Sequence, residues 1–500
     1  MKIPLSCLLP VALLALVSPA ATQQPISGEP QPTTEEDVLE HIAVLASDEF
    51  AGRNPGTIGE VRTLEYLAEQ WARAGMVSGT NDPSSPWFQP VPLVERTPAA
   101  TSARFMRGGR VVEMNRDGIL LGADMAEASA SGPVIFVGYG TDAAGRVTAN
   151  VDGKIAIMLF SPPEGAEDFP SRNDRRAALA GAGAVAALTV APDRFLWRAI
   201  QRSIRSGSFE LDQPSKAPAV TGIINGDFAR RLFRGSESSL KAEIKAAESP
   251  VYAGFDTGLT AELNTLTQLR RFTSHNVIGK FEGRKPGSGA VLLLGHWDHF
   301  GICRDAEAED RICNGAVDNA SGMAVLTEVA EELGRLGPFD RDIYFMGTTA
   351  EERGLLGAYY FADNPVVPLE DIVIALNIDT VAIAERGAPV AIIGRGETDL
   401  DDEIDAVSRS LGREVEESLD ANAFIQRQDG WALAAKGVPA FMVGGSFADL
   451  DLLQSYLRGN YHGPDDETEN LPTLGGAAED TDLHIALARY FADAEKYSPE

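Results

Sequence analysis

The stretch that decides the fold is residues 291–299, VLLLGHWDH, in which an apolar run leads directly into polar residues. A short apolar run of this kind is typical of a strand that is buried on both faces of a parallel sheet. Similar runs occur at Ile343–Met346, Ile372–Ile378 and Ala440–Val443, and a helical pattern fills Gly322–Leu336. Alternating buried strands and helices predict an α/β fold, in which helices cover both faces of a mostly parallel central sheet.

Polar side chains that can bind a metal follow these apolar runs. In chain order they are His296, Asp318, Glu351–Glu352, Asp379 and His462. In open α/β sheets, ligands collect at the carboxyl ends of the strands. We therefore expect these side chains to meet in one crevice.

The chemistry of this set predicts a catalytic metal site. Two imidazoles and three carboxylates can hold two divalent ions and leave positions free for water, and such ligands suit zinc or a similar first-row metal. Two ions can share one carboxylate and one hydroxide. A further carboxylate must then accept the proton of the water. The Glu351–Glu352 doublet can supply one ligand and one base.

Five segments of the chain resemble the zinc-dependent aminopeptidases and their relatives, a family that includes glutamate carboxypeptidase II. They are LGHWDH at 294–299, DNASG at 318–322, EERGLLG at 351–357, NID at 377–379 and YH at 461–462. Their order and approximate separations match the family as well. The resemblance implies a zinc exopeptidase type of α/β fold with two Zn²⁺ ions per chain, although cobalt or manganese would suit the same N and O ligands.

The resemblance also implies a role for each site residue. Asp318 is the bridging ligand, with His296 and Asp379 on one ion and Glu352 and His462 on the other. Glu351 is the general base. Asp298 orients the imidazole of His296 without binding the metal. We expect a supporting or structural role for His299 rather than metal ligation.

The rest of the chain fits the same family. GKIAI at 153–157 and AALAGAGAV at 177–185 resemble the β-rich protease-associated domain that is inserted in several members. GRNPGT at 52–57 and NVIG at 276–279 fit the segments that precede the site. We therefore predict a signal peptide at 1–20, a protease-associated insert at 121–250, and a peptidase domain formed by 21–120 and 251–500. Helices are expected from Thr34 and over Thr57–Gly75.

The net charge and the N-terminal segment limit which partners and which location we expect. Among 500 residues, 43 Lys and Arg stand against 73 Asp and Glu, so the formal net charge is −30. Such a chain repels phosphate backbones, which argues against a nucleic-acid partner. Lys2, the apolar run Leu8–Val17 and the small residues Ser18–Ala20 predict a signal peptide. We expect an exported protein, periplasmic or extracellular, without a membrane anchor. The sequence does not specify its oligomeric state.

Two features depart from the simplest pattern. Cys303 and Cys313 predict one disulfide that pins a short acidic loop, with a metal-binding thiol pair as the alternative. Members of the family often carry Ser-Asp-His before the strand that precedes the last ligand. This chain has Gln428-Asp429-Gly430 there, so its specificity can differ.

These observations predict a secreted di-zinc exopeptidase that acts on peptides, specifically an aminopeptidase that releases N-terminal residues. The alternatives are a carboxypeptidase of the same family, an acyltransferase similar to glutaminyl cyclases that uses one zinc, and a non-catalytic homologue similar to the receptors of this family. Those receptors lose ligands, whereas this chain retains the full set.

Overall fold

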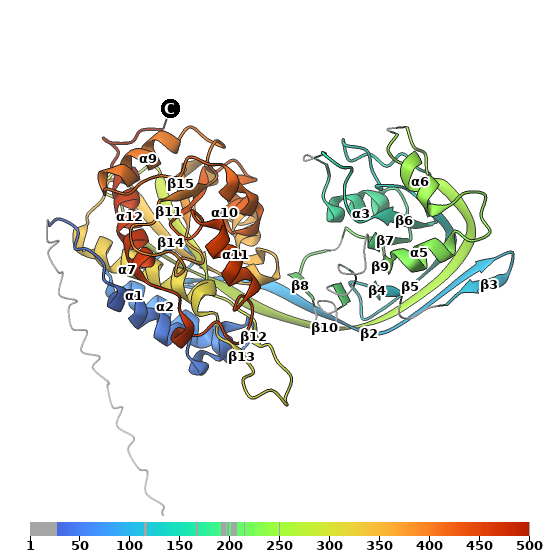
Figure 1. Ribbon diagram of the computed structural model, residues 1–500, viewed down its shortest axis with the longest axis horizontal. Coiled ribbons are helices and arrows are strands. Elements are labelled where there is room, and N and C mark those ends of the chain that lie inside the picture. Colours follow the sequence, from blue (N-terminus) through green and yellow to red (C-terminus); the bar gives the residue numbers. More distant parts are fainter. Residues whose placement is uncertain are drawn as a thin grey trace, which may run out of the picture.

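The computed structural model describes residues 28–114, 118–166, 169–191, 197, 200–201, 208–214, 216–249 and 251–499. The predicted signal peptide lies outside the described residues. Figure 1 shows two lobes joined by two long strands. These strands, β2 (Phe88–Arg107) and β10 (Phe255–Phe281), pair antiparallel and run through both lobes.

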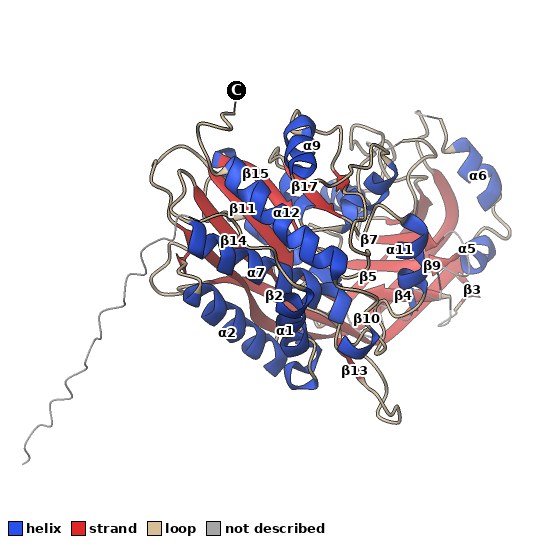
Figure 2. Cartoon of the chain, turned by 60° about the vertical axis from the view of Figure 1, so that its left-hand side comes forward, coloured by secondary structure: helices blue, strands red, loops and turns tan. Residues whose placement is uncertain are grey.

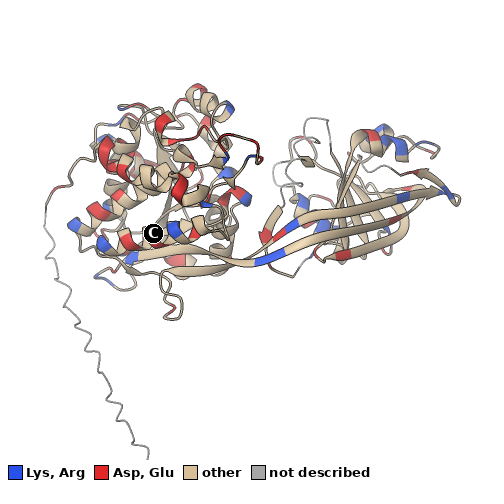
Figure 3. Ribbon diagram, turned by 90° about the horizontal axis from the view of Figure 1, so that it is seen from below, with Lys and Arg blue, Asp and Glu red and all other residues tan. Residues whose placement is uncertain are grey.

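Opposite charges face each other along this two-stranded connection, which Figure 3 shows with acidic and basic residues side by side. Arg270 of β10 lies 2.7 Å from Glu95 of β2, and Arg104 of β2 lies 3.5 Å from Glu262 of β10. Cross-strand pairs of opposite charge favour one pairing register over its neighbours.

The first lobe is built on a mostly parallel sheet, as predicted, in the strand order β16-β17-β15-β11-β14-β10. The bounds are β11 (Ala290–His296), β14 (Asp342–Thr348), β15 (Ile372–Asn377), β16 (Ala391–Ile393) and β17 (Ala440–Gly444). Strand β11 is parallel to β14 and β15, and β15 is parallel to β17. The antiparallel strands β10 and β16 close the two sides, and β1 (Val77–Ser78) pairs with β10.

Helices cover both faces of this sheet, and Figure 2 shows α1, α2 and α7 along one of them. On that face lie α1 (Glu35–Leu45), α2 (Ile58–Arg73), α7 (Ser321–Leu336) and α12 (Gly475–Phe491); on the other lie α8 (Leu356–Asp363) and α10 (Gly430–Ala434). Leu293 of β11 packs into the first core, whereas Leu292 and Leu294 pack into the second. The apolar run is continuous because successive residues enter different cores.

The two N-terminal helices begin where the sequence predicts them. The Thr34 hydroxyl accepts a hydrogen bond from the Asp37 N–H at 3.2 Å, and the Asp37 carboxylate accepts one from the Thr34 N–H at 2.9 Å. This reciprocal cap fixes the start of α1. The Thr57 hydroxyl caps α2, and Gly75 follows its end with φ of +96°. The helices α9 (Asp401–Ser410) and α11 (Leu450–Arg458) complete the described part of the lobe.

The second lobe has its own sheet and its own hydrophobic core. Its strands are β4 (Ile119–Gly122), β5 (Glu127–Phe136), β6 (Ile155–Leu159), β7 (Ala186–Ala191) and β9 (Val220–Asn225), with β3 (Arg110–Glu113) and β8 (Ser208–Leu211) beside β2 and the helices α3 (Arg172–Gly181), α5 (Gly226–Leu232) and α6 (Leu240–Ala246). Strands β5, β6, β7 and β9 are parallel. Phe105 of β2 and Leu263 of β10 contribute to this core. The predicted domain limits stay a prediction.

In the part of the chain that the structure describes, we find no helix with both the length and the apolar character needed to cross a bilayer.

The separate cores predict that the lobes can be destabilised one at a time. Phe136 is fully buried in the second lobe, and Phe345 is fully buried in the first. Replacing either by Ala should cost about 3–5 kcal/mol. By amide hydrogen exchange, Phe136→Ala should deprotect β6 and β7 while β11 and β14 stay protected, and Phe345→Ala should do the reverse. Equal deprotection of both lobes by either variant would contradict this view.

Candidate metal centre

The five predicted metal ligands come together around Asp318 at the carboxyl ends of the first lobe's strands. His296 Nε2 lies 3.2 Å from Asp318 Oδ1 and 3.5 Å from Asp379 Oδ1. His462 Nε2 lies 3.2 Å from Asp318 Oδ2 and 3.0 Å from Glu352 Oε2. Each oxygen of Asp318 therefore faces a different imidazole, and each imidazole also faces a second carboxylate.

The elements of the first lobe bring these residues to one place. His296 is the last residue of β11, and Asp318 lies in the irregular turn Ala316–Ala320 that leads into α7. Glu352 follows β14 in the short helix Glu351–Arg353, and Asp379 follows β15. Three residues in these segments have a left-handed backbone, with φ between 55° and 58°. They are Ala350, which precedes the Glu351–Glu352 pair, Thr380, which follows Asp379, and the ligand His462 itself. Such conformations gather at functional sites, where packing around them maintains the strain.

Burial and charge give the centre its electrostatic character. Burial lowers the pKa of His296, but the carboxylates of Glu351 and Asp379 outweigh it and raise that pKa well above its usual value. Conversely, burial raises the pKa of Asp318, but the imidazoles of His296 and His462 outweigh it and hold that pKa well below its usual value. The centre thus keeps an excess of buried carboxylate charge, which favours a bound cation.

Unpaired atoms in this centre test whether a metal fits. Asp318 Oδ2, Glu352 Oε1 and both ring nitrogens of His299 are buried without a hydrogen-bond partner. Buried polar groups without a partner are costly and uncommon. The ligand atoms of His296, Asp318 and Asp379 lie within 4.8 Å of one another, as do those of His299, Asp318 and Glu352. Because imidazole and carboxylate donors suit zinc, the residues fit the predicted metal.

The predicted base, Glu351, lies beside this cluster. Its Oε2 atom is 4.0 Å from His296 Nε2, and burial raises the pKa of Glu351 well above its usual value. Its backbone N–H donates a hydrogen bond of 2.9 Å to Asp298 Oδ1. Glu351 is therefore held next to the ligands from its own main chain.

Asp298 contacts His296 mainly through its main chain. The Nδ1 atom of His296 is 3.1 Å from the Asp298 carbonyl oxygen and 3.9 Å from the Oδ1 atom of its carboxylate. Burial raises the pKa of Asp298 to about 7. The carbonyl is placed to orient the imidazole, while the side chain holds the backbone of Glu351.

Arg53 has a role at the site that the sequence did not single out. It is fully buried, and its guanidinium donates to the carbonyl oxygens of Leu45, Trp297, Asn314 and Gly315 at 2.6–2.9 Å. Burial lowers the pKa of Arg53 to about 10, so the group stays charged at neutral pH. The only signal in the sequence was its place in the GRNPGT segment.

Two further polar residues hold the loop of Asp318. Asp466 accepts hydrogen bonds from the backbone N–H of Val317 at 2.9 Å and of Asp318 at 3.2 Å. The Asn319 amide donates to the Ile378 carbonyl at 3.0 Å and accepts from the Thr380 N–H at 3.2 Å. Asp466 therefore supports the loop of Asp318, and Asn319 ties that loop to the segment of Asp379.

The predicted disulfide is present and lies against the site. Cys303 and Cys313 are joined, and Cys313 Sγ is 3.6 Å from the carbonyl oxygen of His462. The short strands β12 (Gly301–Ile302) and β13 (Ile312–Cys313) pair at the base of the acidic loop. The bridge thus closes this loop next to a predicted ligand.

The segment Gln428-Asp429-Gly430 lies beneath the strand ends. Asp429 is buried and accepts a short hydrogen bond from the Thr348 hydroxyl at the end of β14. Burial raises the pKa of Asp429 to about 6. The aspartate that the chain shares with the family pattern is therefore part of the floor of the site.

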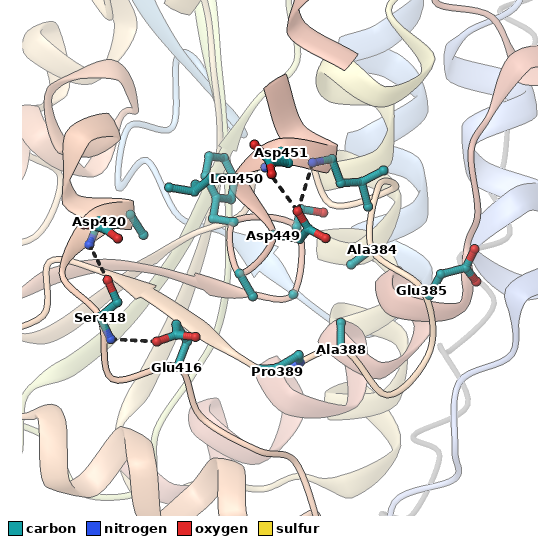
Figure 4. Close-up of a pocket in the computed structure, with 16 residues that line it drawn as sticks. Ala384, Glu385, Ala388, Pro389, Glu416, Ser418, Asp420, Asp449, Leu450 and Asp451 are labelled. Atoms are coloured by element: carbon teal, nitrogen blue, oxygen red, sulfur yellow. Dashed lines mark hydrogen bonds between the residues drawn. The ribbon is translucent and has the colours of Figure 1, made fainter. Parts of the chain in front are cut away.

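A cavity of about 750 Å³ lies apart from the predicted ligands, between the segment that follows Asp379 and the start of α11. Figure 4 shows acidic side chains around it, including Glu416 and Asp449. Glu416 accepts from the Ser418 N–H at 2.8 Å, and Asp449 caps α11. These carboxylates stabilise local turns, and none of the predicted ligands lines the cavity.

A mostly parallel α/β sheet whose strand ends gather imidazoles and carboxylates, with a further glutamate beside them, is an arrangement that suits a zinc metallopeptidase. Residues 276–483 match the family model of peptidase family M28. The matched segment contains all of the predicted ligands and the predicted base.

Two curated proteins are similar to parts of the chain. The chain is 25% identical over 189 residues to the alkaline phosphatase isozyme conversion protein of Escherichia coli, covering 32% of this chain and 53% of that protein. It is 30% identical over 131 residues to mouse aminopeptidase NAALADL1, covering 25% of this chain and 16% of that protein. The chain thus spans about half of the first relative and a smaller part of the second.

A solved structure shows that the fold extends over nearly the whole chain. An aminopeptidase from Aneurinibacillus sp. strain AM-1 superposes with a TM-score of 0.55 at 18% identity, covering 92% of this chain and 94% of that one. The α/β fold predicted from the sequence is confirmed.

The contacts of Arg53 predict a large effect of a charge-preserving change. Lys cannot reach the four carbonyl groups at once, so Arg53→Lys leaves buried acceptors unsatisfied at about 1–3 kcal/mol each. We expect a lower urea midpoint and less zinc per chain by elemental analysis. Arg73→Lys, on the exposed side of α2, is the control and should change neither. Wild-type stability and zinc content in Arg53→Lys would refute a role in holding the site.

Proposed function

We propose that the chain is an exported di-zinc aminopeptidase that removes N-terminal residues from peptides. The arrangement of Asp318 carries this proposal, because its two oxygens face His296 and His462 separately. Each imidazole has a second carboxylate partner, Asp379 or Glu352. The result is two half-sites that share one bridging residue.

His296 and Asp379 would hold one ion, Glu352 and His462 the other, and Asp318 both. When bound, the ions would polarise the scissile carbonyl and lower the pKa of the attacking water. Glu351 lies 4.0 Å from His296 and is proposed to accept the proton of the water and pass it to the leaving amine. Burial raises the pKa of its carboxyl, which makes it a stronger base.

Asp298 is proposed to position two of these groups. Its carbonyl oxygen contacts the Nδ1 atom of His296, so it favours the tautomer whose Nε2 is free to bind metal. Its carboxylate accepts from the Glu351 N–H and fixes the backbone of the base.

Support for aminopeptidase action comes from the relatives. The mouse relative and the solved structural neighbour are both named aminopeptidases. A carboxypeptidase remains the second candidate. The complete set of donors argues against a one-zinc cyclase and against a receptor without ligands.

The second lobe is proposed to be a protease-associated insert. Its separate core and its position between the two halves of the peptidase lobe are consistent with an inserted unit. The disulfide between Cys303 and Cys313 is consistent with an oxidising compartment and therefore with export.

Glu351→Gln tests the proposed base. The amide cannot accept the proton, so kcat should fall by about 10²–10⁴-fold while zinc content stays at the wild-type level. Glu370→Gln, an exposed acid in the same lobe, is the control and should leave both unchanged. Undiminished kcat at equal zinc content would show that another group is the base.

The type of exopeptidase is tested with matched peptides. We expect release of the first residue from peptides with a free amino terminus, no release from N-acetylated forms, and no effect of C-terminal amidation. A chelator should abolish activity, and added Zn²⁺ should restore it. Sensitivity to C-terminal amidation instead of N-acetylation would support the carboxypeptidase.

A further inference from the structure

His299 is a buried imidazole without a hydrogen bond to its ring. Its exposed fraction is 0%, and neither ring nitrogen has a hydrogen-bond partner. Its Nδ1 atom lies 2.6 Å from Glu352 Oε1, and the imidazole helps to lower the pKa of that carboxyl. Two atoms that can each bind a metal ion are thus held close together.

The surroundings of the ring give it no other described polar partner. Phe300 and His462 are its ring neighbours, with centroids at 5.2 Å and 5.9 Å. The polar contact of His299 outside the predicted ligands is made by its main chain, whose N–H donates to the Arg53 carbonyl at 3.3 Å. The imidazole is therefore directed at the metal centre.

We propose that His299 is a sixth protein ligand of this centre and binds the same ion as Glu352 and His462. The inference rests on the proposed two-metal site and changes the expected role of His299 from support to ligation. Ligand atoms of His299, Asp318 and Glu352 lie within 4.8 Å of one another, and His462 Nε2 is 3.0 Å from Glu352. A cation among them would pair Asp318 Oδ2, Glu352 Oε1 and one ring nitrogen of His299.

The added ligand makes the two ions unequal. The ion at His296 would have Asp318 and Asp379 as further protein ligands, which makes three in all. The ion at His462 would have His299, Glu352 and Asp318 as further protein ligands, which makes four in all. Zinc sites with four protein ligands are the closed type and those with three the open, catalytic type. We therefore expect the His299 ion to bind first and more tightly.

His299→Gln and the control His275→Gln test the inference by metal content. The control histidine pairs with Glu60, away from the ligands. In zinc-buffered dialysis, wild type and His275→Gln should retain two ions. His299→Gln should lose the tighter step, with a decrease in affinity of about 100-fold or more, beyond what loss of a residue outside the coordination sphere usually causes. Unchanged affinities for both ions in His299→Gln would overturn the inference.

X-ray absorption separates ligation from indirect support. At full zinc loading, wild type should show three imidazoles over two ions, and His299→Gln should show two. Two imidazoles in the wild type would overturn the ligand role.

The metal-free proteins give an independent measurement. His299→Gln loses the contact with Glu352 in both forms, but only the zinc-loaded form also loses a metal ligand. Its urea midpoint should therefore fall further with zinc than without it. An equal loss of stability with and without zinc would show a structural role and overturn the inference. Failure of wild type to bind two ions would refute the proposed function as well, whereas two ions with an unchanged imidazole count in His299→Gln would refute only the role of His299.

Discussion

The site depends first on one buried cation that belongs to the protein, the guanidinium of Arg53. It donates to carbonyl groups of α1, of the segment after β11 and of the loop before Asp318, which lie far apart in the sequence. The same charge is attracted by Asp466, Asp318 and Asp298. Arg53 therefore joins the main chain of two ligand-bearing loops and offsets part of the negative charge that the centre concentrates. In a salt bridge, an arginine directs its N–H donors at one carboxylate. The guanidinium of Arg53 instead donates to main-chain carbonyl oxygens and thereby fixes the positions of the loops that carry them.

A second constraint is the sheet itself. Because β11, β14 and β15 are parallel, their carboxyl ends lie at one edge and deliver His296, the Glu351–Glu352 pair and Asp379 to the same place. Both faces of these strands are packed, so the strand ends can shift only if two cores rearrange. The remaining donors, Asp318 and His462, come from loops and require separate restraints. Asp466 and the disulfide at Cys313 provide contacts to those loops.

The sheet and the donors at its strand ends could be predicted from the local sequence. The contacts that hold the loops in place could not, because they join residues that are far apart in the chain. Buried strands followed by polar residues predict both the sheet and the donors that end its strands, because the apolar pattern and the strand direction are local properties. Arg53 and Asp466 act through main-chain groups that are distant in sequence, and no periodicity marks such contacts. The nearness of Asp298 to His296 was predicted, but whether the carbonyl or the carboxylate faces the ring depends on the backbone angle after β11. The unpaired state of His299 likewise depends on what its neighbours leave unsatisfied.

The electrostatics of the centre link its folding to its chemistry. Carboxylates that are buried together repel one another. Without a metal cation, protonated imidazoles compensate their charge. The pKa of His296 is raised well above its usual value, and that of His462 is raised to about 9. A metal ligand must instead be a neutral imidazole, so metal binding has to displace these protons. The protons and the metal thus compensate the same charge and compete for the same nitrogen atoms. The loops that carry the donors are held by Arg53, Asp466 and Asn319 through main-chain contacts that do not involve those nitrogens. The fold can therefore keep the donors in place while the compensating charge changes from proton to metal, which is the property that a reversible metal site requires.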